Sequence, residues 1–432
     1  MNSIASHDSI DTFSTEAARL PLPLPIARPY LLVLFSVPFY IDASGRRWID
    51  ALWAKDLLGH TRYIKRLTLA ATTIRGPAPA NSIAIDTVPG LAQIVCVDLP
   101  RATSTGEALT LLPRTLSILW KSLRHVAIVH TSVAAWPLPE AWVMLPLLVF
   151  RRRPLYINVE SAFWRLVPGQ PAGRGRRLRA AVTERLNRFC LGHSDISTFT
   201  SEGYKRSLLK SGAERGHVIE ASWIDEANLI PESALNARIT AGRSLAPLKL
   251  VFAGRLDAAK GILVLLDAVA EALQAGAQLD LEIYGAGTLE AEVARRIAIP
   301  DLAPHVRLCG SLPYGPLFFE TLRRYDALVA PILSDEQPRI VFDAFSQGLP
   351  VLASRTPGLA QCVREGVTGI FDTPGDVHAL AKTLSRVAAN REIVQQMAPA
   401  CLARAKQATH RGMHEARWRL LTSKFPSLTR EH

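Results

Sequence analysis

Two successive series of short apolar runs, each run followed by a helical pattern, constrain the fold of this chain most. The first series comprises residues 30–40, 92–99, 125–132, 155–161 and 195–201, and the second comprises 248–254, 279–287, 306–311, 326–331 and 350–354. Runs of this length that lead into a loop and a helix are typical of buried parallel strands. The repetition predicts an α/β protein with two doubly wound, Rossmann-like domains in tandem.

The boundaries of these domains follow from the polar segments. Residues 236–246 are polar, end their helical pattern at Gly242, and are interpreted as a linker. We therefore expect the first domain at residues 28–240 and the second at 247–408. Residues 1–27 open polar and acidic, without the apolar core and cleavage site of a signal peptide, and are interpreted as a mobile N-terminal tail.

Cysteine usage and hydropathy indicate a cytoplasmic location. The five cysteines are scattered, with no CxxC pair and no Cys/His cluster, so neither a disulfide framework nor a zinc site is expected. The most membrane-like stretch, residues 135–153, is interrupted by Glu140 and three prolines. Its apolar part is shorter than the roughly 20 residues that a spanning helix needs.

The chain carries a net charge of +12, and basic residues are concentrated at 150–154 and 173–189. Two interpretations stay open for these clusters. They form a solvated helix face, or they attract anionic lipid head groups and hold the protein peripherally on the inner face of a membrane. Nucleic acid is not an expected partner, because no aromatic stacking motif or known binding module accompanies the charge.

In the second domain, "FAGRLDAAKG" (252–261) follows the first strand. Gly254 permits a sharp turn, Arg255 follows at once, and Lys260 stands at the head of a helix. An anion here would meet helix-end N–H groups, a guanidinium and an ammonium, which suits a diphosphate. Two ordinary surface cations are the alternative. Gly285 and Gly287, after the next strand, are weak evidence alone, because any tight strand–helix turn favours glycine.

The stretch "DEQPRIVFDAFSQGLPVLAS" (335–354) places two carboxylates at the next strand end. Pro338 suits the first turn of a helix, so Asp335 is expected in the preceding loop and Asp343 one turn into the helix. Both are expected to face one crevice, where carboxylates accept hydrogen bonds from sugar or ribose hydroxyls. The alternative is a helix cap and a solvated helix acid.

Together with "TPGLAQCVREGVTGIF" (356–371), these motifs make residues 248–390 resemble the nucleotide-sugar-binding domain of the family-four glycosyltransferases, of the type that acts in exopolysaccharide biosynthesis. The resemblance implies the GT-B fold, in which two Rossmann-like domains face a cleft. It implies that Arg255 and Lys260 bind the donor diphosphate, that Asp335 acts catalytically at the donor sugar, and that Asp343 binds the ribose. It also places four further residues in the donor-binding motifs: Gly285, Gly287, Pro338 and Arg339.

The chain departs from the family pattern at three acids. Both motif glutamates are aspartates, and Gln361 replaces a third glutamate. The shortening is either absorbed by a small backbone shift or marks a different sugar or weakened activity. The resemblance further implies transfer with retention of configuration, with no metal and no cofactor besides the nucleotide-sugar co-substrate.

The resemblance is looser in the first domain. Residues 36–60 occupy the place of a glycine-rich loop, where Gly45 would let the backbone approach the donor phosphates and Trp48 would begin a helix. Glu160 falls where relatives carry a histidine near the reacting sugar; it orients hydroxyls, acts as a base, or merely pairs with Arg165. His130 ends a strand and is either a substrate contact or a core histidine.

The final segment, residues 410–432, contains an amphipathic helix that the resemblance returns to the first domain. The predicted function is that of a retaining hexosyltransferase that moves a sugar from a nucleotide-diphosphate sugar to a saccharide linked to polyprenyl diphosphate. The alternative is a catalytically silent nucleotide-sugar-binding subunit, which the Asp-for-Glu changes motivate.

Overall fold

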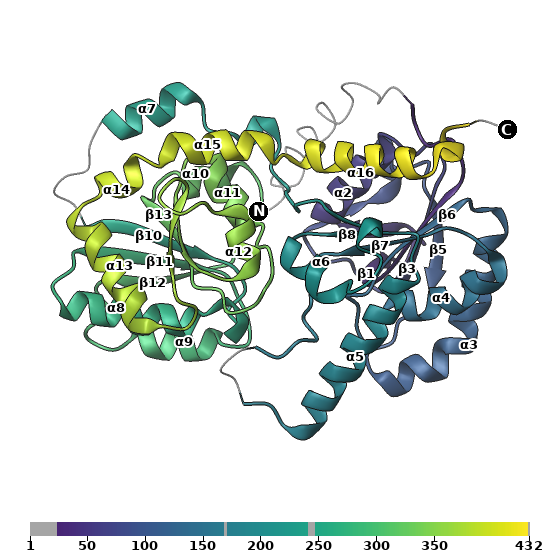
Figure 1. Cartoon of the computed structure of the whole chain (residues 1–432), viewed down its shortest axis with the longest axis horizontal. Helices are drawn as coiled ribbons and strands as arrows, with labels where there is room; N and C mark the ends of the chain where they lie inside the picture. Colours follow the sequence, from purple (N-terminus) through teal and green to yellow (C-terminus); the bar gives the residue numbers. More distant parts are fainter. Residues whose placement is uncertain (1–23, 168–170, 241–246, 431–432) are drawn as a thin grey trace.

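Two α/β domains lie side by side in the computed structural model, which describes residues 24–167, 171–240 and 247–430 (Figure 1). Within these ranges the N-terminal domain is built on a sheet of nine strands and the C-terminal domain on a sheet of six. The tandem doubly wound architecture predicted from the repeated strand–helix pattern is thus confirmed.

Parallel pairing dominates the N-terminal sheet. Its parallel strands run in the order β5-β3-β1-β6-β7-β8-β9. In chain order they are β1 (Tyr30–Ile41), β3 (Leu67–Arg75), β5 (Val95–Leu99), β6 (Ile128–Ser132), β7 (Leu155–Val159), β8 (Ile196–Phe199) and β9 (Gly216–Val218). The helices of this domain are α2 (Ala51–Thr61), α3 (Thr105–Ser122), α4 (Glu140–Arg151), α5 (Arg174–Gly192) and α6 (Glu202–Leu208).

A β-hairpin replaces the expected strand–loop–helix at residues 36–60. After β1 the chain turns back into the antiparallel strand β2 (Arg47–Asp50), which also pairs with β4 (Ser82–Ala84). The turn closes because the Asp42 carboxylate accepts hydrogen bonds from the backbone of Ser44 and Arg46. Gly45 lies at the exposed tip with φ 84°, in a hairpin turn and not in a loop between strand and helix, and its contact with donor phosphates stays a prediction. Trp48 belongs to β2, and α2 begins after the cap Asp50.

The C-terminal sheet is entirely parallel, in the order β12-β11-β10-β13-β14-β15. Its strands are β10 (Leu248–Ala253), β11 (Leu279–Tyr284), β12 (Val306–Gly310), β13 (Ala327–Ala330), β14 (Val351–Ser354) and β15 (Gly369–Asp372). Its helices are α8 (Ile262–Gln274), α9 (Glu290–Ile297), α10 (Pro316–Leu322), α11 (Ile340–Ser346), α12 (Pro357–Cys362), α13 (Val377–Ala389), α14 (Glu392–Gln395) and α15 (Ala398–Gln407).

The chain passes between the domains earlier than residue 240. Helix α7 (Glu232–Thr240) lies against the C-terminal domain, where Leu235 packs on Ala398 and Leu402 of α15. Ile224 already belongs to the C-terminal core. The first domain therefore ends between Val218 and Ile224. Residues 241–246 of the expected linker lie outside the described residues.

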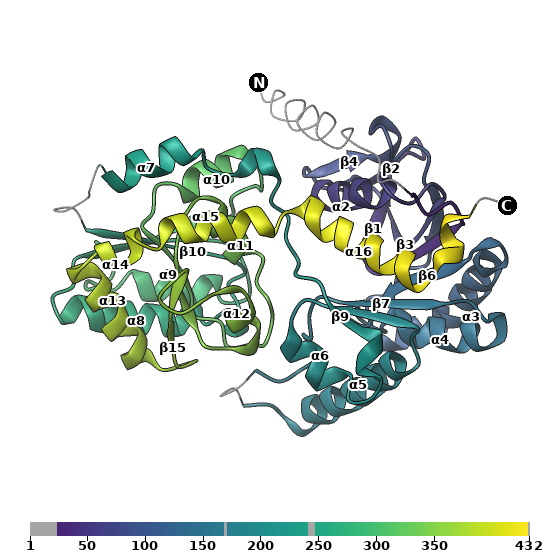
Figure 2. The same ribbon diagram turned by 45° about the horizontal axis from the view of Figure 1, so that its top comes forward.

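The chain returns to the N-terminal domain through α16 (His410–Lys424), which lies across that domain in Figure 2. Leu421 and Leu428 are part of the N-terminal core. The Leu428 carbonyl accepts a hydrogen bond from the backbone of Ala27 at 2.9 Å, and Ile26 forms a bridge with Ile64. The expected tail therefore ends before Ile26. Residues 1–23 and 431–432 lie outside the described residues.

Candidate active site

A hollow of about 350 Å³ lies where β10, β11 and β12 end. Carboxyl ends of neighbouring parallel strands meet at one edge of a sheet, which is where doubly wound domains bind ligands. The lining includes two of the predicted donor-binding residues, Arg255 and Gly285. Other lining residues are Gly254, Tyr284, Ser311 and Ile340.

The two predicted glycines allow the loops after β10 and β11 to touch. A Cβ on Gly285 would lie 1.8 Å from the carbonyl oxygen of Gly254, and a Cβ on Gly287 would lie 2.4 Å from that of Leu256. Backbone hydrogen bonds join the loops, with the Leu256 N–H donating to the Ala286 carbonyl at 3.0 Å. Backbone packing accounts for both glycines, and their contact with a donor stays a prediction.

The two predicted diphosphate-binding cations flank the start of α8. Arg255 Nη2 lies 3.1 Å from Asp257 Oδ2, and the side chain is 71% exposed. Lys260 ends a 3₁₀ turn that the Asp257 side chain caps. Its Nζ lies 2.7 Å from Glu336 Oε1, and both of these side chains are largely buried. An anion at this end of α8 would compete with the two carboxylates for the cations.

The segment that carries both motif aspartates begins where the C-terminal domain meets Arg165 of the N-terminal domain. Asp335 lies in the loop after β13, is 45% exposed, and approaches Arg165 of the N-terminal domain (Oδ2–Nη1 3.8 Å). The buried Pro338 opens the first turn of α11, since its carbonyl accepts from the Val341 N–H. Arg339 is exposed and places its guanidinium over the Trp223 ring at 4.4 Å.

Asp343 is buried on α11 and accepts a hydrogen bond from Tyr314 Oη at 2.9 Å. Burial raises the pKa of this carboxyl to about 6, against the opposing effects of Tyr314, Arg339 and Lys55. A carboxyl group with this pKa is mostly ionised at neutral pH and accepts hydrogen bonds from hydroxyls.

Lys55 of α2 brings the N-terminal domain to the same place, a contact that was not predicted from the sequence. Its Nζ lies 2.6 Å from Asp225 Oδ2, donates to the Trp223 carbonyl, and stands 5.9 Å from the centre of the Tyr314 ring. The side chain is only 7% exposed. The helix also carries Asp56 and His60, so a lysine on it does not stand out, and the partners of Lys55 are remote in the sequence.

The two predicted catalytic residues of the N-terminal domain have different surroundings. Glu160 follows β7, is 40% exposed, and lies 3.5 Å from Arg417 Nη2 of α16. Arg165 pairs instead with Glu184 at 2.8 Å and with Asp335, so the suggested Glu160–Arg165 pair is wrong. His130 is 4% exposed inside β6 and stacks on a tyrosine ring at 4.1 Å. Burial lowers its pKa well below the ordinary value, and the placement supports the core alternative.

Gln361, which replaces a family glutamate, lies at the contact between the domains. Its Oε1 accepts from the Glu202 N–H at the start of α6, at 3.5 Å. Beside it, Gly203 of α6 packs so closely on Pro357 of α12 that an added Cβ would lie 2.8 Å from the proline Cβ. A neutral amide is suited to this contact, because the N–H that Gln361 accepts from belongs to Glu202, whose own carboxylate would repel a second one nearby.

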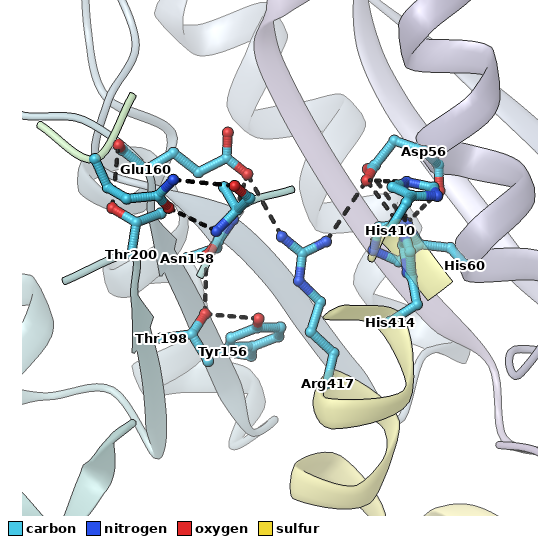
Figure 3. Close-up of polar contacts among 12 residues, drawn as sticks. Asp56, His60, Tyr156, Asn158, Glu160, Thr198, Thr200, His410, His414 and Arg417 are labelled. Atoms are coloured by element: carbon cyan, nitrogen blue, oxygen red, sulfur yellow. Dashed lines mark hydrogen bonds and ion pairs between the residues drawn. The ribbon is translucent and has the colours of Figure 1, made fainter. Parts of the chain in front are cut away.

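A further group of polar side chains lies between α2 and α16, which the sequence did not predict. Asp56 of α2 meets His410 and His414 of α16, and Arg417 extends from α16 between Asp56 and Glu160 (Figure 3). The absence of a Cys/His cluster was expected from the sequence, yet the fold assembles an Asp/His cluster. The spacing of His410 and His414, one helical turn apart, was the available signal.

Comparison with solved structures defines the class of fold. Sucrose-phosphate synthase from Thermosynechococcus elongatus superposes with a TM-score of 0.69 at 18% identity, covering 93% of this chain and all of that one. HepE from Anabaena, solved with UDP and glucose, gives a TM-score of 0.66 at 16% identity, covering 92% and 100%. The chain has the GT-B fold, as predicted.

Sequence comparison identifies the second domain. Residues 247–390 match the family described as "Glycosyl transferases group 1". The amylovoran biosynthesis glycosyltransferase AmsK of Erwinia amylovora is 31% identical over 39% of this chain and 42% of its own length. A D-inositol 3-phosphate glycosyltransferase of Streptomyces griseus is 30% identical over 41% and 39%. The alignments thus cover less than half of the length of these curated relatives. The predicted resemblance of the second domain to family-four glycosyltransferases is confirmed.

Proposed function

We propose that this protein transfers a sugar from a nucleotide-diphosphate sugar to an acceptor, with retention of configuration. The observation that carries the proposal is the placement of Arg255 and Lys260 after β10 and of Asp343 on α11, after the neighbouring strand β13, at the carboxyl edge of the sheet of the matched domain. Support comes from the relatives, which are named glycosyltransferases, and from HepE, which was solved with UDP-glucose.

The geometry supports a division of roles around the donor. Arg255 and Lys260, at the head of α8, receive the diphosphate, and Asp343 accepts hydrogen bonds from the ribose. As the bond between sugar and diphosphate breaks, negative charge grows on the leaving phosphate. Two cations and a helix N-terminus stabilise that charge more in the transition state than in the bound donor. Asp335 faces the sugar, where positive charge develops.

The acceptor side of the proposal rests on the surface of the N-terminal domain. An apolar stripe runs along one face of α5, exposed at Leu178, Val182, Leu186 and Phe189. Arginines of the same helix flank it, and Arg179 lies 5.2 Å over the ring of Trp136. Trp136 also lines a small, mainly apolar hollow. Such a surface suits an anionic membrane and a lipid-linked saccharide.

These features lead us to propose that the acceptor is a saccharide linked to polyprenyl diphosphate. We propose that the protein acts in exopolysaccharide assembly at the cytoplasmic face of the membrane. Within the described ranges, no helix has the length and apolar character that crossing a bilayer requires. Contact with lipid would therefore be made by the surface of α5 and its surroundings.

The test is a screen of purified protein against nucleotide sugars, with a membrane extract as the source of acceptor. We expect transfer of one sugar, and we expect Lys260→Ala to abolish both transfer and nucleotide binding by calorimetry. Lys382→Ala, an exposed lysine of α13, is the matched control. Binding without transfer for every sugar would instead support the silent partner subunit, and neither binding nor transfer would refute both.

A further inference from the structure

Three ligand atoms from the two ends of the chain converge between α2 and α16 (Figure 3). His414 Nε2 lies 3.2 Å from His410 Nε2 and 3.2 Å from Asp56 Oδ1. His410 Nε2 lies 3.6 Å from the same carboxylate oxygen. All three residues are buried, and Asp56 is 358 positions away from His414.

The spacing of these atoms is that of ligands around a tetrahedral ion. Zinc binds imidazole nitrogen and carboxylate oxygen at about 2.0–2.1 Å, so neighbouring ligand atoms in a tetrahedron are roughly 3.3–3.4 Å apart. The three observed separations of 3.2, 3.2 and 3.6 Å bracket this value. A single cation can therefore stand about 2 Å from all three atoms without rearrangement of the helices.

The charged side chains around the cluster have a net negative charge, which a bound cation would balance. Arg417 reaches Asp56 at 3.6 Å and Glu160 at 3.5 Å, while Lys55 pairs with Asp225 at 2.6 Å. Among these five groups there are three carboxylates and two cations, so one negative charge is uncompensated.

The surroundings fix the orientation of the ligands. The ring of His414 occupies the space above Gly59 of α2, where an added Cβ would lie 2.2 Å from Nε2. Its other nitrogen, Nδ1, faces Tyr63 Oη at 3.5 Å. On α2, His60 Nδ1 hydrogen-bonds to the Asp56 carbonyl at 3.0 Å. Outer contacts of this kind hold metal-binding imidazoles in place.

We propose that Asp56, His410 and His414 bind one zinc ion, with water as the fourth ligand. The ion ties the C-terminal helix to α2, the helix whose Lys55 pairs with Asp225. This site is separate from the hollow at the C-terminal strand ends, and its test involves no sugar transfer, so the proposal stands or fails independently of the proposed function.

The experiment uses the full chain, stripped of metal with a chelator and titrated with zinc chloride. We expect one zinc per chain by elemental analysis, a higher Tm with zinc than without it, and the intense visible absorption of tetrahedral cobalt when Co²⁺ replaces zinc. The double variant His410→Gln, His414→Gln should bind zinc at least about 100-fold more weakly, because outer-shell changes alone cost 10–100-fold. His378→Gln, an exposed histidine of α13, is the matched control.

A conservative variant tests whether misfolding explains a loss of zinc binding in the double variant. His410→Cys removes the imidazole contacts but supplies a thiolate, which binds zinc, so it should retain one zinc per chain. Three results would overturn the proposal. They are a wild-type chain that takes up no zinc, a double variant that binds zinc as tightly as wild type, and NMR evidence at pH 7 that a protonated imidazole supplies the missing positive charge.

Discussion

At the scale of residues, Asp335 and Asp343 belong to one loop–helix segment but have different environments. Asp335 is 45% exposed and faces the guanidinium of Arg165. Asp343 is buried and already accepts a hydrogen bond from Tyr314. A carboxylate that stays partly in water beside a cation is easily rearranged when substrate binds. A buried one holds its position, so the two acids are suited to different parts of the donor.

We expect the two aspartates to differ in their kinetic effects. Asp343→Asn weakens hydrogen bonds to the ribose that ground and transition states share, so it should raise the donor KM about tenfold with little change in kcat. Asp335→Asn removes a charge beside the developing positive charge of the sugar, so kcat should fall more than affinity. Steady-state kinetics on both variants checks this. Two folded variants with wild-type kinetics would show that neither aspartate acts on the donor.

The raised pKa of Asp343 predicts a pH dependence of donor binding. The carboxyl has a pKa of about 6, so it gains a proton and loses its charge as the pH falls below 6. Affinity for a nucleotide sugar should therefore fall between pH 7 and pH 5, and this fall should be absent in Asp343→Asn. Calorimetry across this range measures it. Equal pH profiles for wild type and variant would contradict the assignment of the ribose to Asp343.

Glu140 predicts a pH dependence of stability in the N-terminal domain. It is fully buried, Oε1 accepts from the Phe35 N–H at 2.7 Å, and burial raises its pKa from 4.5 to about 7. The folded state thus binds the proton more tightly than the unfolded state, and stability contributed by the protonated group is lost as the pH rises from about 4.5 to about 7. Glu140→Gln should stabilise the domain by up to ~3 kcal/mol at pH 8 and by little at pH 4.

Urea unfolding of wild type and Glu140→Gln at both pH values checks this expectation. The glutamine keeps the acceptor for Phe35, so the charge is the main difference between the proteins. A stabilisation that is equal at pH 4 and pH 8 would show that packing, and not ionisation, is responsible.

Whether the place of a residue could be predicted depended on how far away its partners lie in the sequence. Arg255, Lys260 and Asp343 belong to local motifs, and the structure places them at strand and helix ends as expected. Lys55 and the Asp56–His410–His414 cluster were missed, because their partners lie in other domains or at the far end of the chain. Spacing within one helix shows which side chains share a face, but it does not show which other element packs against that face.

At the scale of elements, long apolar strands were predicted and short edge strands were not. β2, β4, β9 and β15 have three or four residues each and lie at or next to a sheet edge, whereas β8, β13 and β14 have four residues each, lie inside their sheets and were predicted. β3 is longer, but its sequence LTLAATTIR mixes threonine and alanine with the apolar residues. The hairpin of β1 and β2 was mistaken for a loop because its turn depends on Asp42, whose side-chain contacts a hydropathy pattern does not reveal.

The turn between β10 and α8 predicts a large effect of a small substitution. Gly261 has φ 71°, and an added Cβ would lie 1.9 Å from the Pro331 carbonyl oxygen. Gly261→Ala should therefore destabilise the C-terminal domain by about 3 kcal/mol or more and weaken nucleotide binding, because Lys260 precedes it. Thermal unfolding and calorimetry measure the two effects.

Gly276→Ala is the matched control, because Gly276 has φ 87° with open space around its Cβ position. It should lower the free energy of unfolding by only ~1–2 kcal/mol, the cost of placing alanine in the left-handed backbone conformation, and leave nucleotide binding unchanged. Equal losses of stability in the two variants would show that the approach to Pro331 does not matter.

At the scale of the whole molecule, the chain passes twice between the domains. The first passage lies between Val218 and Ile224, and its Ala221 exchanges two backbone hydrogen bonds with the Gln337 side chain. The second is formed by α15 and α16 (Figure 2). Direct contacts between α6 and α12 add a third point of attachment. Movement of one domain relative to the other must therefore bend both passages together.

The surface around α5 predicts binding to anionic vesicles. Arginines attract the lipid and the apolar stripe inserts, so binding should weaken as salt rises, since exposed charges are screened beyond about 8 Å at physiological ionic strength. Leu186→Ser with Phe189→Ser should weaken binding at every salt concentration. Vesicle sedimentation measures this, with uncharged vesicles as control. Vesicle binding that does not depend on salt concentration, or the absence of binding, would support the alternative that α5 presents a solvated helix face.

The return of α16 also has a consequence for the order in which the protein folds during synthesis. Leu421 and Leu428 fill the N-terminal core, and the Leu428 carbonyl pairs with Ala27 near the opposite end of the chain. At about 5–20 residues per second, a ribosome needs roughly 10–40 s to make the 200 or so residues that separate the last N-terminal strand from α16. For that time the emerging domain has an uncovered apolar face, which chaperones must cover until the C-terminal helix has been made.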